Sequence, residues 1–152
     1  MILFKLFCKL IVVYSFSLSQ GEFVDKKEDN LWKNKLSEEE YFVTRCNGTE
    51  PPFTGKYYNH KEKGTYNCNC CKHPLFSSDV KYDSGSGWPS FWDSINKKNI
   101  KTKEDNSVGQ IRIEIICANC DAHLGHIFED GPNPTGLRYC VNSLSLDFKD
   151  KK

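Results

Sequence analysis

Apolar and polar residues alternate in two stretches of the second half of the chain. Residues 111–115 read Ile-Arg-Ile-Glu-Ile, and residues 143–148 read Ser-Leu-Ser-Leu-Asp-Phe. Because successive side chains of a strand point to opposite faces, this period of two predicts half-buried β-strands. Short apolar segments at 74–76 and 81–82 lie between turn-forming residues and indicate further strands. The pattern predicts an antiparallel, mostly-β domain.

One short helix is predicted near the start of this domain. Ser37 and Glu40 have the spacing of a capping box, in which each side chain bonds the backbone N–H of the other residue. A helix is therefore expected over residues 37–44. Phe42 and Val43 are expected to pack inward from it.

Composition divides the chain into four segments. Residues 1–19 carry lysines, an apolar run and small residues with signal-peptidase spacing, which predicts a secretory signal peptide and localisation in the ER lumen or outside the cell. A mitochondrial presequence is the less favoured alternative, because the segment lacks arginine. Residues 20–36 are charged and weakly patterned, and a flexible lead-in is expected. Residues 37–149 form the predicted domain, with an ordered loop at 48–64, and residues 150–152 form a basic tail.

Length and charge narrow the possible partners. A chain of 152 residues is long enough for one domain with a single core. The 21 basic and 20 acidic residues nearly balance, so no basic face for nucleic acid is expected. The apolar run at 10–16 is too short to span a bilayer, so stable membrane insertion is not expected. Balanced charge and modest size favour a monomer.

Four of the eight cysteines form two Cys-x-x-Cys pairs, Cys68 with Cys71 and Cys117 with Cys120. Each two-residue gap lets a tight turn direct two sulfurs at one ion, and zinc prefers four thiolates in a tetrahedron. The pairs are 45 residues apart, so a structural Zn²⁺ would clamp two distant hairpins. The alternative is two redox dithiols or disulfides, which a secretory route would favour. Cys70 lies between two of the ligands and is expected to be a bystander.

Cys140 lies outside this predicted metal site, between Arg138 and Asn142. On a strand these three side chains share one face. A cation and an amide beside a thiol lower its pKa and orient what it attacks, which favours a catalytic cysteine. The alternative is a buried, inert cysteine, the usual state of a free thiol.

His123 and His126 lie just before this cysteine in the sequence. Each is a candidate zinc ligand, core histidine or proton donor. Since four thiolates are available, zinc does not need them, and at least one is expected to supply the acid for the thiol's substrate. Trp88 lies between a Ser-Gly-Ser-Gly segment and a proline, so it is as well suited to a pocket wall as to the core.

Taken together, the motifs resemble the methionine-R-sulfoxide reductases, the MsrB family, from about Leu36 to Phe148. The resemblance implies two antiparallel sheets (a β-tent, or Mss4-like, fold) clamped by a Cys₄ zinc, and reduction of the R epimer of methionine sulfoxide in the repair of oxidative damage. The matching segments are Val-Thr-Arg45, Gly-Thr-Glu-Pro-Pro-Phe53, Cys68-x-x-Cys71, Ser-Gly-Ser-Gly-Trp-Pro-Ser-Phe91, Cys117-x-x-Cys-x-x-His-Leu-Gly-His126, Asp-Gly-Pro-x-Pro-Thr-Gly136 and Arg-Tyr-Cys-x-Asn-Ser143.

The resemblance also implies roles for the polar residues. Cys140 would attack the sulfoxide sulfur, and Arg138 would keep it as the thiolate. His126, with His123 and Asn142 nearby, would supply hydrogen bonds and the proton for the sulfoxide oxygen, which is a poor leaving group until protonated. Cys140 would become a sulfenic acid, which thioredoxin or another thiol must then reduce.

Two aromatic residues complete the implied site. Trp88 and Phe128 would bind the substrate, with Trp88 holding its methyl group. That apolar contact would separate methionine sulfoxide, free or in proteins, from more polar compounds.

The chain departs from a common family pattern at one position. Many members carry a second, resolving cysteine where this chain has Ser86. Either Cys46 acts as the resolving thiol, or a small thiol or external reductant attacks the sulfenic acid directly. Asn47 begins a glycosylation sequon next to Cys46, and a glycan there would crowd a moving Cys46.

Two other functions compete with that of an enzyme. A zinc-clamped β module that binds a protein partner would have no need of a thiol beside Arg138, Asn142 and two histidines. A thioredoxin-like oxidoreductase would require a βαβ pattern around a Cys-x-x-Cys pair, and neither pair has one. The sequence therefore predicts an enzyme.

Overall fold

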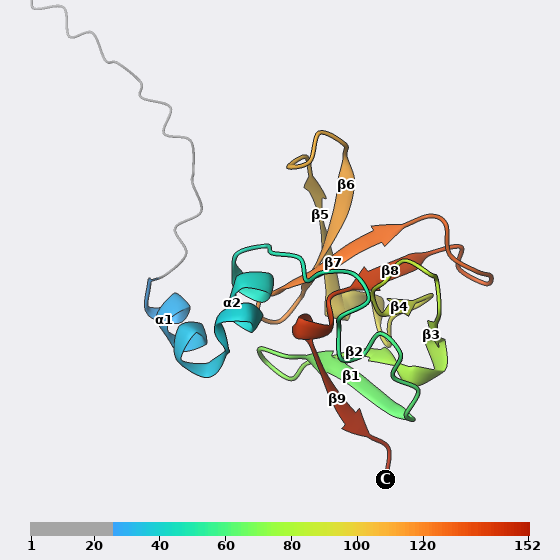
Figure 1. Cartoon of the computed structure of the whole chain (residues 1–152), viewed down its shortest axis with the longest axis horizontal. Helices are drawn as coiled ribbons and strands as arrows, with labels where there is room; N and C mark the ends of the chain where they lie inside the picture. The colour runs from blue at the N-terminus through green and yellow to red at the C-terminus, as the bar shows by residue number, and fades with distance from the viewer. Residues whose placement is uncertain (1–25) are drawn as a thin grey trace, which may run out of the picture.

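Two short helices and two antiparallel sheets make up residues 26–152, the part of the chain that the computed structural model describes (Figure 1). The predicted fold class is confirmed. Within this part of the chain, no helix has both the length and the apolar character needed to cross a membrane.

The smaller sheet has three strands in the order β2-β1-β9. They are β1 (Gly64–Cys68), β2 (Pro74–Ser77) and β9 (Leu146–Asp150). Tyr66 on the central strand lies opposite Phe76 on one side and Phe148 on the other. This sheet joins the first cysteine pair to the C-terminal end of the chain.

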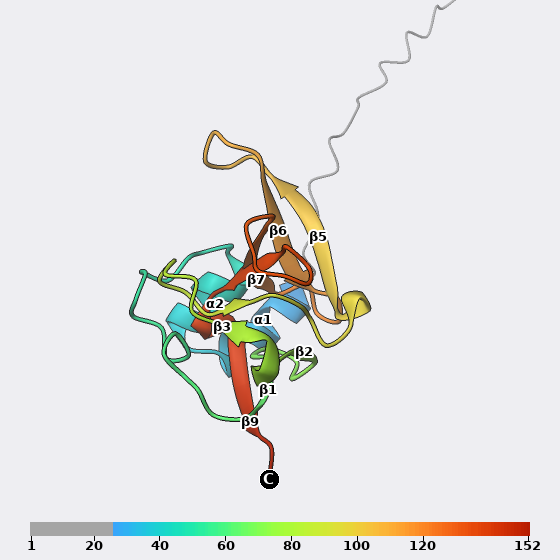
Figure 2. The same ribbon diagram turned by 90° about the vertical axis from the view of Figure 1, so that its right-hand side faces the viewer.

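The larger sheet has six strands in the order β3-β4-β8-β7-β6-β5. They are β3 (Lys81–Tyr82), β4 (Ser90–Phe91), β5 (Ile100–Asp105), β6 (Arg112–Cys117), β7 (His123–Phe128) and β8 (Arg138–Val141). Single 3₁₀ turns are η1 (Ser78–Val80), η2 (Lys97–Asn99) and η3 (Ser143–Ser145). The β5–β6 hairpin extends away from the rest of the molecule in both views (Figures 1 and 2).

Aromatic side chains pack the two sheets together. Phe76 of the smaller sheet stacks on Phe91 of the larger sheet, with ring centroids 4.3 Å apart and planes 12° from parallel. Tyr66 and Tyr139 meet these rings edge-on, and three of the four are fully buried. Burial of each such side chain contributes about 1.5–3 kcal/mol, so this cluster is a main source of the fold's stability.

The predicted helix is present as α2 (Glu38–Arg45). Ser37 accepts a hydrogen bond from the Glu40 amide at 3.2 Å, and the Glu40 carboxylate accepts from the Ser37 amide at 2.9 Å, so the capping box is complete. Val43 is buried as expected, but Phe42 is 56% exposed. Its ring lies against Gly48 instead, at a place where a side chain on that glycine would clash with it.

A second helix, α1 (Lys26–Lys35), lies where a flexible lead-in was expected, so that expectation was wrong for these residues. The segment has little apolar periodicity, and Trp32 is its main contact with the core among the described side chains. Trp32 packs against the core, and its ring faces the cations of Lys35 and Arg45. The predicted signal peptide at 1–19 lies outside the described residues.

The last strand begins later than predicted. Residues 143–145 form η3, because the amides of Ser143 and Leu144 donate to the Glu50 carboxylate at 2.6 and 3.0 Å. Those amides are then not available to a sheet ladder. The simple alternation over residues 111–115 also fails, since Ile111, just before β6, is 74% exposed and Glu114 is buried. A buried glutamate thus takes part in each deviation, Glu50 at η3 and Glu114 in β6.

Candidate active site and metal centre

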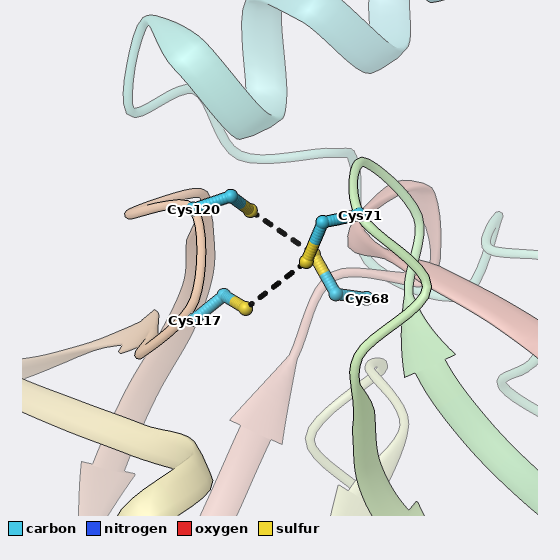
Figure 3. A group of neighbouring side chains, drawn as sticks. All are labelled: Cys68, Cys71, Cys117 and Cys120. Atoms are coloured by element: carbon cyan, nitrogen blue, oxygen red, sulfur yellow. Dashed lines mark hydrogen bonds between the residues drawn. The ribbon is translucent and has the colours of Figure 1, made fainter.

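The four paired cysteines converge between two hairpin turns. Cys68 and Cys71 lie at the β1–β2 turn, and Cys117 and Cys120 at the β6–β7 turn (Figure 3). The sulfurs of Cys68 and Cys120 are 3.6 Å apart, as are those of Cys71 and Cys117, and all four sulfurs lie within 4.8 Å of one another. The predicted grouping is confirmed, and these thiols could hold a metal ion.

The same backbone turn occurs at each pair. The residue after the second cysteine, Lys72 or Asp121, has a positive φ of 61° or 55°. Its amide donates to the carbonyl of the first cysteine of the pair, at 2.8 Å for Lys72 and 2.9 Å for Asp121. This turn places both sulfurs of a pair on the same side. Cys70 stands outside the group, as expected.

Cys140 lies on β8, in the middle of the larger sheet, at the base of a separate pocket of about 100 Å³. His126 is directly opposite Cys140 on β7. Cβ atoms of such cross-strand pairs lie about 4.5–5.5 Å apart, so the imidazole and the thiol face the same small space. The lining residues are Thr49, Trp88, Arg112, Gly125, His126, Phe128, Cys140 and Asn142.

An irregularity in β7 brings both histidines to one face. Residues three apart on a regular strand point to opposite faces. Between β6 and β7 the pairing shifts, so that Ile115 lies opposite Gly125 and Ile116 lies opposite His123. Leu124 is thus an extra residue, a β-bulge. The rings of His123 and His126 come within 5.7 Å as a result.

Gly125 is required where the bulge meets β8. Its φ is +153°, and a Cβ there would lie 2.0 Å from the carbonyl oxygen of Cys140. Only glycine permits this approach. The glycine in the His-Leu-Gly-His motif therefore sets the distance between the histidine strand and the cysteine strand.

A residue of the β5–β6 hairpin forms a hydrogen bond with His126. The Nε2 atom of His126 lies 2.7 Å from Asp105 Oδ2, and a guanidinium nitrogen of Arg112 lies 2.6 Å from the same oxygen. Hydrogen bonds from Ser107, His126 and Arg112 hold the pKa of the Asp105 carboxyl well below its usual range. Asp105 is therefore an ionised acceptor, which fixes the imidazole orientation.

His123 is not part of the pocket wall, contrary to its predicted place beside the substrate. It is 3% exposed, and its Nδ1 lies 2.6 Å from Glu114 Oε1. Burial lowers the pKa of His123, with the contact to Glu114 opposing that change. The buried pair packs behind His126 and supports it.

Asn142 and Trp88 lie in the pocket as predicted, and both are tied to one loop residue. The Asn142 side chain accepts from the Glu50 amide at 3.1 Å and donates to the Leu124 carbonyl at 3.2 Å. The Trp88 indole N–H donates to the Glu50 carbonyl at 3.0 Å. Burial raises the pKa of Glu50, against the hydrogen bonds from Ser143 and Leu144. Glu50 thus organises one side of the pocket.

The environment of the Cys140 thiol differs from the sequence prediction. Burial raises its pKa above the ordinary value, and the Ser86 hydroxyl and Arg138 oppose this rise only in part. The predicted lowering of the pKa is not found, because burial of the thiol outweighs the charge of Arg138. Its guanidinium makes two hydrogen bonds to Asp130, at 2.7 and 2.8 Å, and lies 4.3 Å from the centre of the Phe128 ring.

Two further thiol-related positions can now be placed. The Ser86 hydroxyl lies 3.7 Å from the Cys140 sulfur, at the position where a resolving cysteine was expected in many relatives. Cys46 is exposed and caps the C-terminal end of α2, three residues before Thr49 of the pocket.

Comparison with known proteins shows the family. A sequence model of the SelR domain matches residues 36–150. A protein of Synechococcus sp. (strain RCC307), named peptide methionine sulfoxide reductase MsrB, is 59% identical over 123 residues, covering 81% of this chain and 90% of that protein. The chain belongs to the MsrB family. Two further proteins of the same name also match. The one from Thioalkalivibrio sulfidiphilus is 60% identical, covering 80% of this chain and 88% of that protein. The one from Acinetobacter baumannii is 59% identical, covering 83% of this chain and 91% of that protein.

Membership of this family confirms two predictions and overturns one. The MsrB resemblance and the prediction of an oxidoreductase that reduces methionine sulfoxide are confirmed. Localisation in the secretory pathway is wrong. The relatives that overturn this prediction are bacterial proteins, and bacterial cells have no ER. A glycan at the Asn47 sequon depended on entry into the ER and is not proposed.

Several site residues were missed in the sequence. Asp105, Arg112 and Glu114 come from one hairpin, and Thr49 and Glu50 come from the loop after α2. Arg112 and Glu114 alternate regularly with isoleucines, so the sequence placed them on a strand but gave no sign that they reach the site. The contacts of Asp105 with His126 and of Glu50 with Asn142 span 21 and 92 positions, and they have no local signature.

Proposed function

We propose that this MsrB-family protein reduces the R epimer of methionine sulfoxide, free or in proteins, with Cys140 as the nucleophile. The observation that carries the proposal is the pocket, in which a lone thiol faces His126, Asn142 and two aromatic rings. A thiol, a proton donor and an apolar wall are what sulfoxide reduction requires.

The proposed step transfers the oxygen atom to Cys140. The Cys140 sulfur attacks the sulfoxide sulfur and forms an S–S bond. That bond and the substrate S–O bond then break as the oxygen transfers to the Cys140 sulfur, which leaves methionine and a sulfenic acid. The substrate sulfur gains two electrons and the Cys140 sulfur loses two. The thiol proton is conserved, because it ends on the sulfenic oxygen.

His126 would move that proton. The resting thiol is largely protonated at neutral pH, since burial raises the pKa of Cys140. An imidazole opposite the thiol can carry the proton to the sulfoxide oxygen, and Asp105 balances the charge of the imidazolium during the transfer. Asp105 and His123 would act as positioning residues, because neither lines the pocket. Asn142 would donate its free N–H to the oxygen.

Trp88 and Phe128 would bind the substrate methyl group. The pocket of about 100 Å³ admits the end of a side chain and little more. Trp88 is anchored by its N–H to the Glu50 carbonyl, and Arg138 covers the outer face of Phe128. Arg138 would also favour the thiolate during attack, since its charge opposes the effect of burial on Cys140.

The cysteine cluster would hold a structural Zn²⁺. Four thiols from two tight turns match the donor set that zinc prefers, and no open ligand position is needed for structural zinc. Bound zinc would supply cross-linking of the two hairpins. The residues that would hold it are Cys68, Cys71, Cys117 and Cys120.

The catalytic cycle would close through a second thiol. Ser86 cannot form a disulfide, so we propose that Cys46 attacks the sulfenic acid, releasing water, and that thioredoxin or another thiol reduces the resulting disulfide. Support comes from the exposure of Cys46 and its position before Thr49. A single chain supplies all of these residues, and we expect the protein to act as a monomer in repair of oxidised methionine.

Activity on the two separated sulfoxide epimers tests the main proposal. With dithiothreitol as reductant, the wild type should reduce only the R epimer of a blocked methionine sulfoxide. Cys140→Ser should lower the rate by at least about 10³-fold without unfolding the protein. A folded, zinc-loaded wild type without turnover would reject the proposal and leave a non-catalytic zinc-clamped binding module.

Cys46→Ser tests the recycling route. With thioredoxin as reductant, turnover should stop after about one equivalent of methionine per enzyme, while turnover with dithiothreitol continues. Cys70→Ser serves as the matched control. An unchanged rate with thioredoxin would remove Cys46 from the cycle and leave direct attack by an external thiol.

A further inference from the structure

A second, larger hollow lies beside the catalytic pocket. Its volume is about 820 Å³, within the range of roughly 300–1,000 Å³ in which ligand sites fall. One wall is α2 and the other is the loop that follows it, with η3 and the start of β9 as the floor. In Figure 1, α2 and the loop that follows it lie beside the short turn that precedes β9. We call this hollow the α2 groove.

The α2 groove borders the proposed catalytic pocket. Thr49 lines both hollows. Asn142, a wall of the pocket, is followed directly by Ser143 and Leu144, which form the floor of the groove. A polypeptide whose oxidised methionine enters the pocket must place its neighbouring residues on the surface around it, because the pocket holds only a side-chain end. The groove is a hollow of suitable size at that border.

The groove combines apolar surface with negative charge. Phe42 is 56% exposed at its rim, and Pro51 and Leu144 contribute further apolar surface. Glu38 and Glu39 are exposed on the helix wall, and neither forms an ion pair with another described residue. Acidic residues in a first turn also stabilise a helix, but that role does not require them to border a hollow.

Little positive charge offsets these carboxylates. Lys56 is the one basic residue that lines the groove among the described residues, and it lies over the Tyr57 ring. Asp147, also in the groove, is paired with Lys72 outside it at 3.3 Å. Because Glu38 and Glu39 are negatively charged and form no ion pair with another described residue, a polypeptide bound in the groove should carry positive charge.

We infer that the α2 groove binds the polypeptide flank of a methionine sulfoxide residue and favours flanks that carry lysine or arginine. The inference rests on the proposed function, and it assigns a substrate class to the same site: oxidised methionine in basic, apolar sequence contexts. Free methionine sulfoxide would not use the groove.

Matched peptides test the inference. Each contains one methionine R-sulfoxide, with three lysines or three glutamates on its N-terminal or its C-terminal side, and kcat/KM is measured with dithiothreitol at low salt. When the charged residues are on the flank that reaches the groove, N-terminal or C-terminal, kcat/KM for the lysine peptide should exceed that for the glutamate peptide by about fivefold or more. Salt at 0.5 M should largely abolish this difference. Blocked methionine R-sulfoxide measures the basal reaction.

Variants identify the groove as the source of the preference. Glu38→Gln/Glu39→Gln should remove it and leave turnover of the blocked amino acid unchanged, whereas Lys56→Gln should strengthen it. Glu62→Gln/Asp150→Asn, which alters two exposed acids outside the groove, is the control. Since Lys56→Gln acts in the opposite direction, partial loss of helix stability in the first variant cannot imitate the result.

Three results would count against the inference. Equal kcat/KM for all peptides, with normal reduction of the blocked amino acid, would overturn the inference about the α2 groove and leave the proposed function intact. A lysine preference that survives Glu38→Gln/Glu39→Gln would place the charge recognition elsewhere and overturn it as well. No reduction of any sulfoxide would overturn the proposed function and this inference with it.

Discussion

The four-cysteine cluster and the proposed catalytic pocket use the same side chain in opposite surroundings. In the cluster each thiol has three other thiols within 4.8 Å. In the pocket the neighbours of Cys140 are a hydroxyl, an imidazole, an amide and aromatic rings. Thiols that converge can share an ion, and a thiol that stands alone among proton donors can react. The difference shows that the neighbours, not the cysteine, determine its role.

The two regions also differ in how the fold builds them. Each half of the cluster is one tight turn, formed by residues within five positions of one another. The pocket collects residues from β7, β8, the β5–β6 hairpin and the loop after α2. Local turns make the first region, and long-range packing makes the second. Changes that affect one region should therefore leave the other largely unaffected.

The largest expected effect comes from breaking the cluster. Cys120→Ser should lose the metal and destabilise the protein by at least about 3 kcal/mol, a fall in Tm of about 10 °C, because metal binding energy is folding energy. Metal analysis and calorimetry measure both quantities. Cys140→Ser is the matched control and should keep both the metal and the Tm. Loss of metal from that control would show that the two regions are not independent.

A smaller effect is expected from the support of the pocket. Asp105→Asn should lower kcat by about 10–100-fold and leave KM nearly unchanged, because Asp105 orients His126 without lining the pocket. Asp105→Glu should recover part of the rate. Asp121→Asn, which loses an exposed pair with Lys101 near the cluster, is the control. A KM that rises with kcat constant would instead place Asp105 in substrate binding.

The smallest effect concerns the pKa of Cys140. Since this pKa is raised, the thiolate fraction is low at neutral pH and grows as pH rises, so alkylation by iodoacetamide should reach half its maximal rate above the pH of an ordinary thiol. Ser86→Ala removes a donor to the thiolate and should slow alkylation at pH 8 by about twofold.

Mass spectrometry can follow the alkylation of the Cys140 peptide alone. The exposed Cys46 in the same sample is an internal control. Half-maximal alkylation of Cys140 at or below the pH of an ordinary thiol would contradict the effect of burial. Faster alkylation in Ser86→Ala would contradict the proposed hydrogen bond.

These regions were not equally predictable from sequence. The capping box, the Cys-x-x-Cys turns and the β-rich fold follow from short-range spacing, and the structure confirms them. The helix α1 depends on the packing of Trp32 against a distant core, which no local pattern records. The late start of β9 depends on Glu50, some ninety positions away. Where a residue's contact partner is distant in the sequence, the local pattern alone could not predict the secondary structure.

The same contrast explains the errors in the catalytic site. Alternation correctly brought Cys140 and Asn142 to one pocket. It could not show the bulge at Leu124, the burial of His123 on Glu114, or the sharing of Arg138 with Asp130. Charge near a thiol in sequence was therefore a poor guide to its pKa, because burial outweighs a cation that is already paired.

The position of Trp88 has an optical consequence. Its indole lines the pocket and is held by one hydrogen bond to Glu50, whereas Trp32 packs against the core beside α2. Indole emission depends on the polarity and quenchers around the ring, so a sulfoxide that displaces water beside Trp88 changes the signal at the reaction centre itself. With Trp32 and Trp92 replaced by phenylalanine, the remaining fluorescence would time substrate entry and departure without a label.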